Sequence, residues 1–144
     1  MKIIYKISFI LIVLMFISCE TTSPDELDDN EIRHILDSIQ INFSYNDIDS
    51  IMQYYDPLFM HNGNDFDWEQ NIWIIRINDY DVLSFENIEI IIEGDFATAY
   101  FTMSLNDLVT EEPSEENGDI SYFYRQFGGW KLCGRDFSFE PLPN

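Results

Sequence analysis

Two titratable side chains in the sequence could transfer a proton inside a folded domain, His61 and Asp136. Asp136 has the parity of Trp130 along a predicted strand, so it shares whichever face of the sheet that apolar residue occupies. A carboxylate on an apolar interior face has a raised pKa, which suits general acid–base catalysis. The alternative is an Asp136 at the strand end that pairs with Arg135, Arg125 or water. His61 is more typical of a hydrogen-bonded turn residue than of a general base.

Aromatic side chains that carry a polar atom form a second group of candidates. A tyrosine or tryptophan can line a pocket with its ring and hold a ligand through its hydroxyl or indole N–H. The residues predicted to contact a ligand are Tyr54, Trp73, Tyr100 and Tyr124. The alternative is that such residues, Tyr122 among them, belong to the core or to a pocket wall. Tyrosine content alone does not identify an oxyanion hole.

Residues 62–69 place oxygen-bearing side chains at near-alternate positions, as a calcium loop does. The segment lacks the glycine at the sixth position and the distant bidentate glutamate of an EF-hand, and Asp65 and Asp67 are explained as helix caps. No Cys or His pair has zinc spacing, and no glycine-rich phosphate loop precedes a helix. The sequence therefore predicts neither a metal site nor a cofactor.

The elements that must position these residues begin with helices. Apolar residues at helical spacing predict an amphipathic helix from residue 31 to about residue 43. Asp47 is expected to cap a shorter helix that Asp56-Pro57 ends, and residues 58–61 form a short strand or turn. A third helix is predicted over residues 65–79. Within it Asp67 and Gln70 have capping-box spacing, and the apolar stripe is expected to hold Trp68, Ile72 and Ile75, with Trp73 and Ile77 beside it.

After the helices the apolar period changes from 3.6 to 2, which predicts antiparallel strands. The strands are expected at residues 82–93, 96–105, 120–127 and 130–139, with turns at Gly94-Asp95 and Gly128-Gly129. The second strand has one wholly apolar face and one mostly hydroxyl-bearing face. Residues 106–119 are expected to form a loop too acidic to pack. Helices followed by an antiparallel meander predict an α+β fold.

The first 18 residues have the organisation of an export signal. Lys2 and Lys6 precede an apolar run over residues 7–17, and Ser18-Cys19 closes it. Eleven residues at about 1.5 Å each are too short to span a bilayer core of about 30 Å.

The segment Phe16-Ile17-Ser18-Cys19 resembles the lipobox of bacterial lipoproteins, with Phe16 in place of the usual Leu. The resemblance implies that Cys19 is the lipidated first residue of a mature protein held on a membrane of the bacterial cell envelope. The alternative is an ordinary cleaved signal with a chance cysteine. Cys133 then has no partner within the chain and is most simply a small buried residue.

Charge excludes one class of partner. The leader holds two of the seven Lys and Arg, so the rest of the chain has five basic against 27 acidic residues, a net charge of −22. A nucleic-acid binder needs basic residues to neutralise phosphates, so this class is excluded. Residues 19–30 are acidic and lack an apolar period, which predicts a tether between membrane and domain.

The order of elements, together with Asp47-x-x-Ser50-Ile51-Met52-x-x-Tyr55, the strand from Glu93-Gly94-Asp95 and the ending Gly128-Gly129-Trp130-Lys131-Leu132, resembles the nuclear-transport-factor-2-like superfamily. The resemblance covers nearly all of residues 31–139. It implies a domain over residues 31–140 in which a cone-shaped, curved antiparallel sheet wraps around N-terminal helices, with ligands at the cone's mouth.

Function does not follow from that resemblance, because this fold supports many functions. Many members end the strand after the Trp-Lys motif with a histidine and, two residues on, a serine, whereas this chain has Asp136 and Ser138 there. The first hypothesis is a lipid-anchored, non-catalytic domain that binds a small apolar or amphiphilic ligand or a protein partner. The second is an isomerase, dehydratase or cyclase that uses Asp136 or His61. A homodimer formed through the open sheet face is a third possibility.

Overall fold

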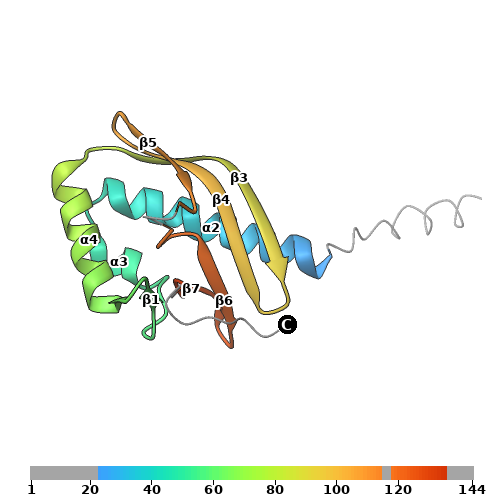
Figure 1. Ribbon diagram of the computed structural model, residues 1–144. Helices are drawn as coiled ribbons and strands as arrows, with labels where there is room; N and C mark the ends of the chain where they lie inside the picture. Colours follow the sequence, from blue (N-terminus) through green and yellow to red (C-terminus); the bar gives the residue numbers. More distant parts are fainter. Residues whose placement is uncertain (1–22, 115–117, 136–144) are drawn as a thin grey trace, which may run out of the picture.

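The computed structural model describes residues 23–114 and 118–135 of the 144-residue chain. Helices pack on one face of a curved antiparallel sheet. Figure 1 shows α2 crossing behind the strands and α4 standing at one end of the sheet. The predicted leader, Cys19 and Asp136 all lie outside the described residues. Among the described residues, no helix combines the length and the apolarity needed to cross a bilayer.

The first helix starts earlier than its apolar period predicts. Helix α2 spans Pro24–Ser44, with the side chain of Ser23 accepting a hydrogen bond from the Glu26 N–H at 3.2 Å. Pro24 suits the first helical position, where no N–H donor is needed. The tether predicted for residues 19–30 is therefore wrong from residue 24 onward. Those residues belong to the domain because the helix buries Asp28 against the sheet.

The two shorter helices match their predicted positions. Helix α3 spans Ile48–Met52, and the side chain of Asp47 accepts from the Ser50 N–H at 3.0 Å. Helix α4 spans Phe66–Asp79. Its N-cap is Asp65, which accepts from the Trp68 N–H at 3.0 Å, so the capping box of Asp67 and Gln70 is not the one used. A small hairpin of β1 (Met60–His61) and β2 (Asn64–Asp65) precedes α4.

The main sheet is built around one long strand. The strands are β3 (Leu83–Glu93), β4 (Phe96–Leu105), β5 (Leu108–Glu112), β6 (Tyr122–Gln126) and β7 (Gly129–Leu132). Strand β3 pairs along most of β4, while the opposite edge of β4 pairs first with β6 and then with β5. The loop predicted for residues 106–119 is thus wrong over Leu108–Glu112, where β5 adds to the sheet. The final hairpin turns at residues 127–128, since Gln126 pairs with Gly129.

A bulge in β3 changes which of its residues face the core. Asn87 adopts a positive φ of 55°, and the register with β4 shifts between Glu86 and Glu89. Leu83 and Phe85 therefore face the core before the bulge, and the even-numbered Ile88, Ile90 and Ile92 pack against it afterwards. The inward face predicted for β4 is confirmed: Ala97, Ala99, Phe101, Met103 and Leu105 are all buried.

Two acidic side chains fasten α2 to the last hairpin. Asp28 accepts from the Trp130 indole N–H at 3.1 Å and pairs with Arg125. Glu31 accepts from the Trp130 backbone N–H at 3.0 Å. A Cβ at Gly129 would lie 2.2 Å from the Glu31 carboxylate, so only glycine allows this approach. Helix and hairpin are therefore joined by hydrogen bonds as well as by apolar packing.

Trp130→Ala should destabilise the protein by about 3 to 5 kcal/mol, because the ring is buried and its N–H is hydrogen-bonded. Trp68→Ala is the matched control. Trp68 is half exposed on α4, so its removal should cost less than about 1 kcal/mol. Both free energies of unfolding are measured by denaturant titration. A cost below about 1 kcal/mol for Trp130→Ala would contradict the assigned packing.

Candidate functional site

Helix α4 buries charged residues, and this was not predicted. The expected stripe of Trp68, Ile72 and Ile75 is wrong, because Trp68 and Ile75 are about half exposed. The buried side chains are instead Glu69, Trp73 and Arg76, which lie on one helical face at spacings of four and three. Two ionisable groups inside a core need partners close by.

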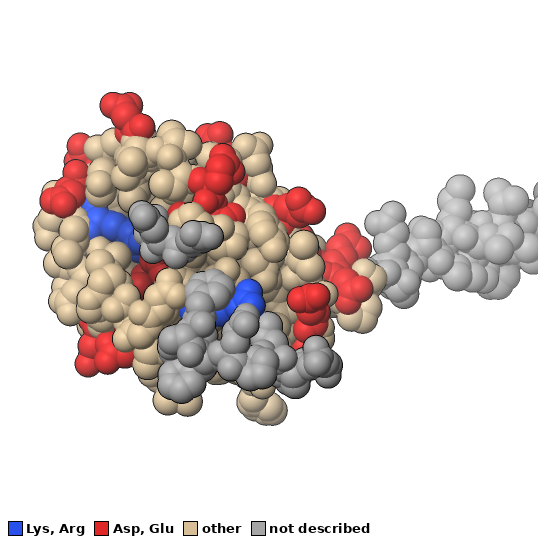
Figure 2. Space-filling model, viewed as in Figure 1, with Lys and Arg blue, Asp and Glu red and all other residues tan. Residues whose placement is uncertain are grey.

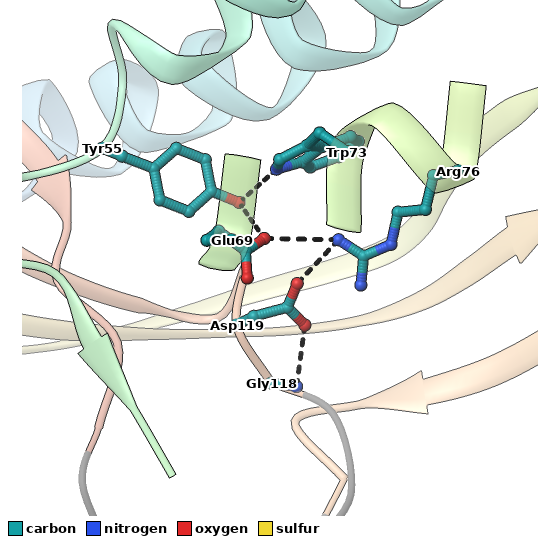
Figure 3. A network of polar contacts seen from close by, with 6 residues as sticks. All are labelled: Tyr55, Glu69, Trp73, Arg76, Gly118 and Asp119. Atoms are coloured by element: carbon teal, nitrogen blue, oxygen red, sulfur yellow. Dashed lines mark hydrogen bonds and ion pairs between the residues drawn. The ribbon is translucent and has the colours of Figure 1, made fainter. Parts of the chain in front are cut away.

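Those partners come from two other parts of the chain (Figure 3). Arg76 donates to an Asp119 oxygen at 2.7 Å and to a Glu69 oxygen at 3.4 Å. The Tyr55 hydroxyl donates to the same Glu69 oxygen at 3.2 Å and accepts from the Trp73 indole N–H at 2.9 Å. These five side chains, here called the interior network, join the segment after α3, helix α4 and the segment before β6.

The pKa values of the two carboxyl groups of the interior network are shifted in opposite directions. Burial and the nearby Asp119 charge raise the pKa of Glu69 well above its ordinary value. Burial would raise the pKa of Asp119 too, but the Arg76 guanidinium and a hydrogen bond from Glu69 hold it below the usual range. Asp119 is therefore the carboxylate and Glu69 the carboxylic acid that donates to it. An acid, a base and a phenol in contact form an arrangement suited to proton transfer.

More polar atoms lie at the same end of the interior. Strand β5 points Glu112 toward the core beside Phe101, and burial raises the pKa of that carboxyl. One Glu112 oxygen accepts from the Ser114 N–H at 3.1 Å. The other, and the Ser121 hydroxyl, are buried with no hydrogen-bond partner among the described residues. Such orphan atoms are commonly satisfied by a bound water or a small polar group.

The interior network is closed to solvent within the described part of the chain. Glu69 is 1% exposed and Asp119 7%. Tyr55, Phe59 and Trp73 fill the space beside them. Among residues 23–114 and 118–135, no cluster of acidic, Cys and His side chains is arranged to hold a metal ion. The interior network is thus a buried, hydrogen-bonded part of the core in which Glu69 keeps its proton.

The catalytic candidate His61 contributes to the packing of the fold, in line with the hydrogen-bonded role that the sequence favours for it. It is buried, and its Nδ1 accepts from the Arg135 backbone N–H at 3.1 Å. Its ring stacks between Phe59 and Tyr122. His61 thereby holds the segment after β7 against β1. Its ring is buried and not open to a substrate. Asp136, the other catalytic candidate, follows the last described residue.

The four predicted ligand contacts do not come together. Trp73 is fully buried in the interior network, and Tyr54 is partly buried against the core. Tyr100 is 43% exposed, on the face of β4 that points away from the helices. Tyr124 packs on Phe96, with ring centroids 4.8 Å apart, on that same outer face. The interior of the cone is therefore not a pocket lined by these four residues.

A groove of about 370 Å³ opens elsewhere, on the outer face of the sheet. Thr98 and Tyr122 pair across β4 and β6, and Cys133 extends the row. Phe96 and the end of β3 at Glu93 line one side of the groove, and Arg135 lines the other. The Arg135 guanidinium lies 5.8 Å from the centre of the Tyr122 ring. These residues are called the outer groove below.

Cys133 adds no nucleophile to the outer groove. It forms no disulfide, and burial raises the pKa of its thiol to about 12. The thiol stays protonated at neutral pH, and only a thiolate reacts readily. Cys133 therefore contributes a small apolar surface, partly buried where the sequence predicts a buried residue.

Sequence reasoning missed Asp119 and Glu112 because both fell in the predicted acidic loop, and it gave no site role to Glu69 or Arg76. One signal was present on α4, where Glu69 and Arg76 lie on the same helical face as Trp73. A face that carries a tryptophan is a candidate for burial, and opposite charges on it can pair. No local signal marks Asp119, which lies in an acidic stretch 43 positions beyond its partner Arg76.

Glu69 should make the protein less stable as the pH rises above about 4.5, its ordinary pKa. The unfolded chain loses this proton near that pH, whereas the folded chain keeps it to higher pH. The folded state thus binds more protons in this window, and the free energy of unfolding falls as the pH rises. The slope due to one proton is at most about 1.4 kcal/mol per pH unit. Glu69→Gln removes this proton linkage, so as the pH rises above about 4.5 the variant should gain stability relative to the parent.

Asp119→Asn is the matched control at neutral pH. It leaves the Arg76 charge buried beside neutral partners and should cost about 3 to 5 kcal/mol. Denaturant unfolding of both variants across the pH range provides the measurement. Parallel stability curves for the parent and Glu69→Gln would show that Glu69 is not the protonated member.

No protein-family model matches the sequence, and no curated protein does. Solved structures do match its fold. A proposed dehydratase of the nuclear-transport-factor-2-like family from Streptomyces avermitilis superposes with a TM-score of 0.52 at 13% identity, over 78% of this chain and 95% of that one. A nuclear-transport-factor-2-like protein from Pseudomonas putida has a TM-score of 0.54 at 15% identity, over 73% and 81%.

The protein Bd1075 of Bdellovibrio bacteriovorus matches with a TM-score of 0.56 at 13% identity, over 78% of this chain. The chain spans only 42% of the length of Bd1075. Likeness at these identities concerns the fold alone. The chain therefore has the α+β cone fold of nuclear-transport-factor-2-like proteins, with N-terminal helices inside a curved antiparallel sheet.

Proposed function

We propose that this protein is a lipid-anchored, non-catalytic domain of the bacterial cell envelope that binds a small amphiphilic molecule in the outer groove. The observation that carries the proposal is the groove itself, where apolar rings, a hydroxyl and both signs of charge meet. Ligand sites typically combine a mostly apolar lining with a few polar groups that orient the ligand.

The lining favours a particular kind of ligand. Phe96 and Tyr122 offer ring surfaces to an apolar body, and the Thr98 hydroxyl lies between them. Arg135 and Glu93 suit a head group that is neutral or carries both charges. A strongly anionic molecule is disfavoured at long range, because the chain after the leader has a net charge of −22. In Figure 2 acidic side chains are spread over the visible face, whereas Lys and Arg side chains cover only small areas of it.

The interior of the domain supports the non-catalytic assignment. The acid–base groups of the interior network are hydrogen-bonded to one another, since Arg76 donates to the carboxyl groups of both Glu69 and Asp119. The His61 Nδ1 atom is occupied by a backbone N–H. A substrate in the outer groove would meet the Thr98 hydroxyl and a protonated Cys133 thiol. Among the described residues the thiol donates only to the Tyr122 and Gly134 carbonyls, so the Glu93 carboxylate of the lining does not activate it.

The anchor rests on the sequence. The charged and apolar leader and the Ser18-Cys19 pair are those of a lipoprotein signal. The first described residue of the domain, Ser23, follows Cys19 closely, which suits a protein attached through that cysteine.

A second candidate is an isomerase or dehydratase that acts at the interior network. The opposite pKa shifts of Glu69 and Asp119 and the orphan oxygen of Glu112 favour it. One proposed dehydratase shares the fold. Turnover that disappears in Glu69→Gln while the variant stays folded would establish this candidate. Ligand binding at the outer groove without turnover would contradict it.

Thr98→Trp should fill the outer groove and weaken binding of lysophosphatidylcholine at least about tenfold, equivalent to about 1.4 kcal/mol. Tyr100→Trp is the matched control, because it places the same ring on the same strand and face but outside the groove. Native mass spectrometry of the parent and both variants measures the bound fraction. Equal binding by all three proteins would rule out the groove as the site.

Cys19→Ser should move the protein from the membrane fraction to the soluble fraction of a bacterial host that processes lipoproteins. The serine has no thiol to acylate, so the anchor cannot form. Fractionation and the mass of the N-terminal peptide provide the readout, with Cys133→Ser as the control. A parent protein without acyl mass on its N-terminal peptide would disprove the anchor.

A further inference from the structure

One end of the domain exposes three large apolar side chains. Leu27 on α2 is 59% exposed, Phe96 at the start of β4 is 57% exposed, and Phe127 in the last hairpin turn is fully exposed. Each would be more stable away from water. They come from three distant parts of the sequence, so their position at one end is a property of the tertiary structure.

Ion pairs and a backbone hydrogen bond hold these parts together. Arg125 pairs with Asp28, and its guanidinium lies 3.7 Å from the Asp95 carboxylate. The Arg125 backbone N–H also donates to the Asp95 carbonyl at 2.8 Å. Leu27 precedes Asp28, Phe96 follows Asp95, and Phe127 is two residues after Arg125. Each of the three apolar residues therefore lies one or two positions from a member of this ion-pair cluster. Leu27, Phe96 and Phe127 are together called the tip below.

The tip is the end of the domain nearest the predicted anchor. Figure 1 shows the start of α2 beside the turn that joins β3 and β4. Only residues 20–22 separate Cys19 from Ser23, the N-cap of α2. Four residue steps of at most about 3.6 Å span about 14 Å. A domain attached through Cys19 thus keeps Ser23, at the start of α2, within about 14 Å of the acylated cysteine.

We propose that the tip is a membrane-contact surface, with Leu27, Phe96 and Phe127 entering the lipid interface. This inference rests on the proposed anchor at Cys19. Aromatic and leucine side chains on a rigid element partition into the interface in this way. The contact orients the domain, so that the opposite hairpin of β4 and β5 points away from the membrane.

The charge of the tip determines which lipid head groups it fits. Asp25, Glu26, Glu93 and Asp95 are exposed around it. These carboxylates repel anionic lipids within a Debye length of about 10 Å at 0.1 M salt. The surface therefore suits zwitterionic head groups such as phosphatidylcholine.

The test uses the full chain, produced with its leader in a bacterium, purified in acylated form and reconstituted into phosphatidylcholine vesicles. A nitrobenzoxadiazole fluorophore is attached at Phe127→Cys, in a Cys133→Ala background. The matched position is Leu108→Cys, an exposed apolar residue at the opposite hairpin. We expect blue-shifted emission at position 127 that bilayer-embedded nitroxide lipids quench. Emission at position 108 should equal that of the unanchored Cys19→Ser protein.

A second probe keeps the native Phe127. The fluorophore at Leu27→Cys should also be blue-shifted, and Phe127→Asp should abolish that shift by placing a charge at the interface. Adding phosphatidylglycerol to the vesicles should reduce the shift, and added salt should restore it. No change with anionic lipid would contradict the assigned charge effect.

Three results would overturn the proposal. Acylated, vesicle-bound protein with equal emission at positions 127 and 108 would show that the anchor exists and the tip contact does not. A concentration-dependent blue shift in the Cys19→Ser protein without vesicles would mean that the tip binds a second copy of the chain. An N-terminal peptide without acyl mass, in protein that does not float with vesicles, would remove the anchor and the tip contact together.

Discussion

The pairing of Arg76 with Asp119 is the interaction on which the interior of this domain depends. Both side chains are buried, and the core contains other acids that a single guanidinium must neutralise. A buried charge without a partner costs several kcal/mol, so this contact constrains both elements that supply it. It holds α4 over the end of the sheet and fixes the path of the chain into β6. Glu69 fits beside this pair only by keeping a proton.

This constraint also determines where a ligand can bind. In a cone fold the interior is a natural ligand site, yet here the interior network, which includes Tyr55 and Trp73, occupies it together with Phe59. Proton-holding groups in such a place stabilise one arrangement of the core, because each hydrogen bond depends on the others. Space for a ligand of useful size is left on the outer face of the sheet, where Phe96 and Tyr122 line the outer groove.

The surface features form a consistent arrangement around β4. Its first residue, Phe96, contributes both to the outer groove and to the tip. Its far end pairs with β5, whose buried Glu112 belongs to the polar end of the interior. One strand thus runs from the proposed membrane contact to the interior network. A ligand in the outer groove would lie near the membrane end of the domain, which agrees with an amphiphilic ligand.

The sequence by itself determined what depends on neighbours along the chain. The periods of 3.6 and 2 located the helices α2, α3 and α4 and the apolar face of β4, and their order predicted the α+β class. The cone shape came from the resemblance to nuclear-transport-factor-2-like proteins. Local patterns also predicted the caps at Asp47 and Asp65 and the turn at Gly94-Asp95, whereas the last hairpin turns one residue earlier than predicted. The leader and Cys19 are predictions from the sequence alone.

Only the tertiary structure decided which polar residues are buried. Asp28 turns inward because Trp130, 102 positions later, offers an N–H. The charged face of α4 is buried because Arg76 pairs there with Asp119, which lies 43 positions later in the sequence. Strand β5 forms in an acidic segment because β4 presents an open edge, and the bulge at Asn87 reverses the parity of β3. The burial of these polar residues depends on contacts between residues that are distant in the sequence. Contacts of this kind leave no periodic pattern along the chain from which they could be predicted.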